Sequence, residues 1–137
     1  MKKILIILFV GFLALNSFGQ DKKEILSSGI QVKRSYSLDV ANGDKDPAIE
    51  KEEFYNFRGD LVEIKEYSDK GKTIDNWVKY KYDAQGNLVE EVELNSKGEQ
   101  KTRIEYKFEN GLKTEKLYYD NKNRLSKKKT FKYELRK

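Results

Sequence analysis

This chain of 137 residues contains no cysteine and no histidine, and it has only one proline and one methionine. Without cysteine there are no disulfide bonds, so an exported domain of this size must depend on packing for its stability. The absence of both residue types also excludes an ordinary zinc site and the Ser–His and Cys–His nucleophile pairs of many hydrolases. The composition thus restricts the chemistry before any motif is considered.

Acidic residues are plentiful, so hydrolysis by a pair of carboxylates remains open in principle. Nearly all of them alternate with lysines along the chain, a pattern that is typical of the solvated face of a sheet. No set of catalytic residue types converges on one segment. We therefore expect a protein that is not an enzyme and that needs no metal and no other cofactor.

The first segment, residues 1–19, has the pattern of a signal peptide. A basic pair at residues 2–3 precedes an apolar run over residues 4–15, and Ser17 and Gly19 supply the small side chains that signal peptidase requires. The apolar run is shorter than the roughly 20 residues of a membrane span. No cysteine follows it, which argues against a lipoprotein anchor. We expect export to the periplasm or beyond, and a mature net charge of +3 in place of +5.

After the signal peptide we expect a flexible or short helical leader over residues 20–29 and one β-repeat domain over residues 30–137. Turn signals recur every 10–13 residues from Ile49 onward, without room for crossover helices. This spacing predicts an all-β antiparallel meander of about eight strands that forms a twisted, curled open sheet. A closed up-and-down barrel is the alternative.

Most of these turns share one form. Three are polar five-residue segments with glycine in fourth place, at residues 68–72, 83–87 and 95–99. Residues 120–124 fit the same form if Asn123 takes the role of glycine, because asparagine tolerates the left-handed conformation best after glycine. Asn110-Gly111 instead predicts a two-residue hairpin turn, and Arg58-Gly59 is a weaker signal of the same kind.

The turns imply a register in which Tyr82 lies opposite Leu88, and Leu94 opposite Gln100. Uninterrupted alternation from these pairs places nearly every large apolar residue on one face. Charges then occupy the other face, with one cross-strand row formed by Lys79, Glu91 and Arg103. The apolar face needs a cover, which curling of the sheet, the segment 20–38 or a homodimer through that face would supply.

Residues 80–88, Tyr-Lys-Tyr-Asp-Ala-Gln-Gly-Asn-Leu, closely resemble the YD (Rhs-type) repeat, with Tyr82, Asp83, Gly86 and Leu88 in its signature positions. Segments 57–61 and 108–112 look more like the aromatic-Asn-Gly-Leu units of MORN-like antitoxin repeats. The resemblance covers roughly residues 53–134. It implies an array of β-hairpins on a secreted or cell-surface protein, with too few units to enclose a ligand.

Two groups of residues are candidate contact sites. The expected polar face carries the aromatic residues Tyr67, Trp77 and Tyr118 together with Arg103, and an exposed tryptophan beside charges is a common recognition feature, unless the N-terminal segment covers it. The C-terminal region is basic. Its lysines Lys127, Lys128, Lys129 and Lys132 suit contact with anionic polymers, or they protect an edge strand against aggregation.

These features predict a binding module that recognises a protein or glycan partner of the cell envelope or the extracellular space through its exposed sheet face. We expect no specific nucleic-acid partner and no membrane span after signal cleavage. The MORN-like units suggest an alternative, an immunity or antitoxin-like protein that neutralises a toxin.

Overall fold

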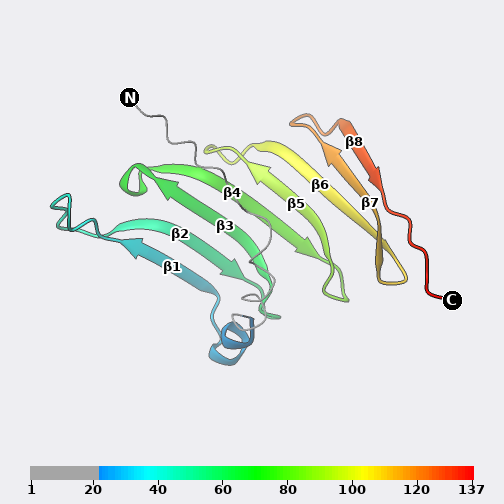
Figure 1. The fold of residues 1–137 in the computed structure, drawn as a ribbon. Coiled ribbons are helices and arrows are strands. Elements are labelled where there is room, and N and C mark those ends of the chain that lie inside the picture. The colour runs from blue at the N-terminus through cyan, green and yellow to red at the C-terminus, as the bar shows by residue number, and fades with distance from the viewer. Residues whose placement is uncertain (1–21) are drawn as a thin grey trace.

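The computed structural model describes residues 22–137, so the predicted signal peptide lies outside the described residues. Within the expected leader, residues 22–28 form a short α-helix. Eight strands follow (Figure 1): β1 (Val32–Ser37), β2 (Ala48–Tyr55), β3 (Leu61–Ser68), β4 (Thr73–Tyr82), β5 (Leu88–Leu94), β6 (Gln100–Glu109), β7 (Leu112–Tyr119) and β8 (Leu125–Thr130). A single 3-10 turn, η1 (Asp69–Gly71), separates β3 from β4.

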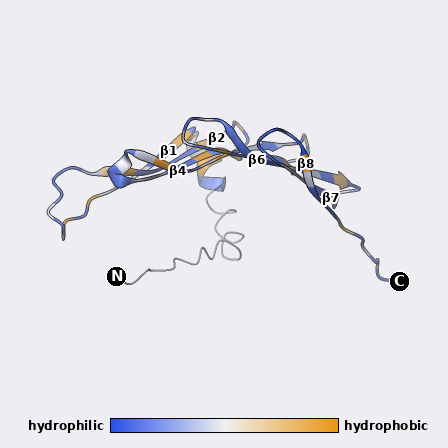
Figure 2. Ribbon diagram, turned by 90° about the horizontal axis from the view of Figure 1, so that it is seen from above, coloured by the Kyte–Doolittle hydropathy of each residue, from blue (hydrophilic) through white to orange (hydrophobic). Residues whose placement is uncertain are grey.

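The eight strands form one antiparallel sheet in the order β1 to β8, so each strand pairs only with its neighbours in the sequence. The predicted all-β meander is confirmed. The sheet is open, with β1 and β8 as its two edges, and the alternative of a closed barrel is wrong. Figure 2 shows the strands edge-on as a single layer.

Four of the turns share one hydrogen-bonding scheme, in which the first residue is asparagine or aspartate. In the turn 95–99, Oδ1 of Asn95 accepts the backbone N–H groups of Lys97 and Glu99 at 2.9 and 3.0 Å. The fourth residue takes a positive φ, which glycine adopts at little cost; in the turn 120–124 this residue is Asn123, with φ 59°, as predicted. The turns with this scheme are 56–60, 83–87, 95–99 and 120–124.

Two of the predicted turns differ from expectation. Arg58-Gly59 is not a two-residue turn, because Asn56 caps the chain there in the same way as Asn95 does in its turn. The segment 68–72 does not adopt the shared scheme. Its first residue, Ser68, makes no capping bond and its hydroxyl donates to Asp75 instead, so the chain folds through η1. The Asn110-Gly111 turn is confirmed, with φ values of 51° and 76°.

Every hairpin contains a β-bulge close to its turn. Tyr82 pairs with Leu88 and Leu94 with Gln100, as predicted, but the next pairs inward are Lys81 with Glu90 and Glu93 with Thr102. One residue is therefore skipped, always on the second strand of the hairpin. The skipped residues in the seven strand pairs are Glu50, Val62, Asp75, Val89, Lys101, Thr114 and Ser126.

These bulges overturn the predicted division of the faces, because a shift of one residue moves every later side chain to the opposite side. Face A carries Val78, Tyr80, Glu91, Ile104, Tyr106 and Tyr118, and face B carries Trp77, Lys79, Val92, Arg103, Leu117 and Tyr119. Apolar and charged side chains occur on both. The predicted row of Lys79, Glu91 and Arg103 is wrong, since Val92 lies between the two cations.

The single layer has very little buried core. Among the described apolar residues only Ile25 and Leu117 are buried. The one-sided apolar face on which the homodimer hypothesis rested is not present, because the bulges distribute its residues over both faces. The strands are instead held by their hydrogen bonds, by half-buried aliphatic and aromatic side chains and by cross-strand ion pairs.

We predict that Asn95→Ala lowers the free energy of unfolding by about 1–2 kcal/mol, because two backbone N–H groups lose their acceptor. Urea unfolding followed by the fluorescence of Trp77, the only tryptophan of the chain, measures this change. Ser96→Ala in the same turn is the matched control, with an expected change within about 0.5 kcal/mol. Equal effects of the two substitutions would show that the cap does not stabilise the turn.

Candidate functional site

The structure places three of the four predicted contact residues on one face. Trp77, Tyr67 and Arg103 lie on face B, whereas Tyr118 lies on face A opposite Ile104. The prediction that all four share a surface is therefore wrong for Tyr118. The bulge at Thr114 shifts β7 by one residue relative to β6 and accounts for this difference.

Trp77 and Tyr67 form polar contacts within the sheet. Nε1 of Trp77 donates to Glu63 at 2.7 Å, and Nζ of Lys65 lies 4.4 Å from the centroid of the Trp77 ring. The Tyr67 hydroxyl donates to Glu52 at 2.5 Å, and burial together with this carboxylate raises the pKa of Tyr67 to about 12. The polar atoms of both aromatic side chains are thus already satisfied by cross-strand partners.

Arg103 is neutralised in the same way. Its guanidinium bonds to Glu105 and to Glu90 on neighbouring positions of face B, and its Nε donates to Asn123 at 3.0 Å. It also stacks over Tyr119, 4.0 Å from the ring centroid. Arg103 holds the pKa of the Glu105 carboxyl below its usual value. Face B around Arg103 therefore has compensated charge.

The four predicted C-terminal lysines do not form one patch. Lys128 lies on face B and pairs with Glu115 at 2.6 Å, whereas Lys127 and Lys129 lie on face A. Lys132 follows the end of β8. All six residues of β8 are exposed, and β8 is an edge strand, as the edge-protection interpretation requires.

Face A of β6, β7 and β8 carries a different basic surface that the sequence interpretation missed. Lysines and aromatic rings lie beside one another on these three strands. Lys113 lies 4.4 Å from the Tyr106 centroid, and Lys116 lies 4.9 Å from that of Tyr118. We call this the lysine–aromatic surface, and it consists of Tyr106, Phe108, Lys113, Lys116, Tyr118, Lys127 and Lys129.

The charge of this surface is not compensated. Within residues 22–137, none of its four lysines forms an ion pair. Lys116 lies directly opposite Lys129, and like charges in that position destabilise a sheet. The nearby cations, Lys116 foremost, lower the pKa of the Tyr118 hydroxyl. The sequence signal was the abundance of lysines and aromatic residues in β6, β7 and β8, but only the bulges show which of them share a face.

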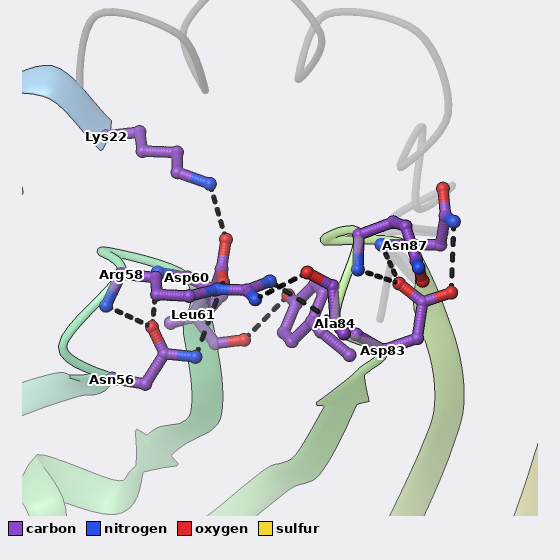
Figure 3. A network of polar contacts seen from close by, with 10 residues as sticks. Lys22, Asn56, Arg58, Asp60, Leu61, Asp83, Ala84 and Asn87 are labelled. Carbon is purple, nitrogen blue, oxygen red and sulfur yellow. Dashed lines mark hydrogen bonds and ion pairs between the residues drawn. The ribbon is translucent and has the colours of Figure 1, made fainter.

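A second polar network, also absent from the sequence interpretation, surrounds Asp60 at the opposite end of the sheet (Figure 3). Asp60 accepts bonds from Lys22 at 2.5 Å, and from Asn56 and Arg58 at 3.3 Å each. The Arg58 guanidinium also donates to the backbone oxygens of Asp83 and Ala84 in the next turn on that side. The network joins the N-terminal helix to two turns of the sheet.

Asp60 is a structural residue of this network. It is the only charged residue within residues 22–137 that is buried, at 6% exposure. Burial by itself raises the pKa of its carboxyl, but the bonds from Lys22, Asn56 and Arg58 outweigh this effect and hold the pKa below its ordinary value. The carboxylate therefore stabilises the folded state in its ionised form.

Two kinds of feature are absent from residues 22–137. No helix in this part of the chain is long and apolar enough to cross a membrane. The same residues contain no group of three or more acidic side chains arranged to hold a metal ion.

Comparisons of the chain with protein-family models, with curated proteins and with solved structures found no match. The resemblance of residues 80–88 to the YD repeat, and of the flanking units to MORN-like repeats, therefore stays a prediction.

We expect Asp60→Asn to lower the free energy of unfolding by about 1–3 kcal/mol at pH 7, because Lys22 and Arg58 lose their buried acceptor charge. The folded-state pKa of Asp60 lies below 3.8, so the carboxylate stabilises the protein above that value and loses this effect as the pH falls through the folded-state pKa. The difference from the wild type should shrink accordingly in acid.

Urea unfolding at a series of pH values from neutral to strongly acidic measures this dependence. Lys22→Gln is the matched control and should have the smaller effect, because Asn56 and Arg58 still donate to Asp60. A difference between Asp60→Asn and the wild type that stays constant down to strongly acidic pH would contradict the assigned role.

Proposed function

We propose that this chain is an exported, non-enzymatic binding module that holds an anionic polymer of the cell envelope or the extracellular space on its lysine–aromatic surface. The polymer carries carboxylate, sulfate or phosphate groups along its length. The module acts after removal of residues 1–19, and its repeat architecture serves as the scaffold for the surface.

The uncompensated charge on face A of β6 to β8 is the observation that carries this proposal. Basic residues on face B mostly have acidic partners, as Arg103 has Glu90 and Glu105, and Lys128 has Glu115. The four lysines of the lysine–aromatic surface have none within the described residues, and Lys116 and Lys129 repel each other across the strands. A bound polyanion relieves that repulsion, so the folded protein gains from the ligand.

The form of the surface suits an extended ligand. The lysines lie on two neighbouring strands, β7 and β8, which are spaced by roughly 4.8 Å in a sheet, so several anionic groups of one chain can be contacted together. The aromatic rings beneath the ammonium groups restrict their motion through cation–π contacts, which limits the entropy lost on binding. An exposed single-layer sheet offers such a surface without an enclosing pocket.

We predict that Lys113→Gln with Lys116→Gln weakens binding to heparin, used as a sulfated polyanion probe, by about tenfold at low salt. Affinity measured over a range of salt concentrations should also depend less steeply on salt, because fewer counterions are displaced. Both residues lie inside the sheet on β7, so the edge strand is unchanged.

Lys72→Gln with Lys97→Gln is the matched control, since it removes the same charge from two exposed turn residues. The control should leave heparin affinity within about twofold of the wild type. Equal losses in the two double variants would indicate attraction by net charge alone and would reject the lysine–aromatic surface as the binding site.

A further inference from the structure

We infer that the outer edge of β8 is a docking site for an acidic, extended peptide segment of a partner protein, which adds to the sheet as a ninth, antiparallel strand. The inference concerns backbone groups at the edge, and it does not rest on the proposed binding of a polymer to face A. Two observations lead to it: the orientation of the free backbone groups and the position of the unpaired lysines.

The backbone of β8 has one set of hydrogen-bonding groups that face away from the sheet. The N–H of Phe131 donates to the oxygen of Thr114 at 2.9 Å, which identifies that pair as hydrogen-bonded. Hydrogen-bonded pairs alternate in an antiparallel ladder, so Lys129 and Lys127 also bond to β7. The N–H and C=O groups of Lys128 and Thr130 then point outward, where no segment within residues 22–137 pairs with them.

The side chains specify the chemistry of the incoming strand. An added strand would place its hydrogen-bonded residues opposite Lys128 and Thr130, and the residues between them opposite Lys127 and Lys129 on face A. Since Lys127 and Lys129 have no acidic partner within the described residues, acidic side chains fit there. Lys128 is already paired with Glu115, so an uncharged residue suits the position opposite it. The matching segment therefore alternates acidic and uncharged residues.

The same charges disfavour addition of a second copy of this chain. Two β8 edges would bring their lysines together, and like charges opposite each other destabilise a sheet. The other edge strand, β1, carries Lys33 and Arg34, whose charges are already paired with Glu53 and Glu52 of β2. The lysines of β8 thus oppose self-association and favour a partner of opposite charge.

The test uses a short synthetic peptide that alternates glutamate and valine, titrated against the isotope-labelled protein and followed by NMR. We expect the amide resonances of Lys128 and Thr130 to shift and to gain protection from exchange with solvent. Those of Lys127 and Lys129, which already bond to β7, should change less. Uniform shifts over all lysine amides, or none, would overturn the inference.

Two N-methylated versions of the peptide separate strand addition from attraction between charges. Methyl groups on the valine nitrogens remove the donors that face β8, so affinity should fall about tenfold or more. Methyl groups on the glutamate nitrogens, which face away from β8, should leave affinity within about threefold. Equal affinity of the two methylated peptides would refute strand addition.

Protein variants keep this inference distinguishable from the proposed function. Thr130→Pro removes an outward N–H that β7 does not use, so it should weaken peptide binding and retain heparin binding, whereas Thr130→Ala should retain both. Lys113→Gln with Lys116→Gln should instead weaken heparin binding and retain peptide binding. Loss of both ligands in Thr130→Pro, with an unchanged free energy of unfolding, would contradict the assignment of the outward backbone groups of β8 to the peptide alone.

Discussion

The bulge next to each turn is the constraint on which the surface of this protein depends. Each of the seven hairpins skips one residue on its second strand. Residues that pair across two strands lie on the same face of the sheet. Each bulge therefore determines which side chains of the second strand lie on the same face as those of the first. The compensated charges of face B and the uncompensated lysines of face A both follow from this repeated shift.

The fold was largely predictable from the sequence, whereas the site was not. Polar five-residue turns with glycine or Asn123 in fourth place indicate where strands end. They also predict the residue pair next to the turn, such as Tyr82 with Leu88. The bulges leave no such signal, because residues as different as Val89, Lys101 and Ser126 occupy the skipped position. Uninterrupted alternation therefore assigned Tyr118 to the wrong face.

The charges divide the molecule into two kinds of polar surface. Around Asp60 and Arg103, the charged groups form hydrogen bonds and ion pairs with one another and with neighbouring residues of the sheet, its turns and the N-terminal helix. Such networks specify one arrangement of the elements and offer little to a ligand. Around Lys116 and Lys129, like charges lie opposite each other on neighbouring strands, and no acidic side chain within the described residues pairs with them.

The meander order of the strands also has a consequence for how the chain folds. Because each strand pairs only with its neighbours in the sequence, the contacts between strands within residues 22–137 join consecutive strands and none pairs strands far apart along the chain. Sheets are usually slow to fold because they must bring distant segments together, but here each new hairpin needs only the one before it. The sheet can therefore assemble progressively, one hairpin at a time, and it can fray at β1 or β8 while the central strands remain paired.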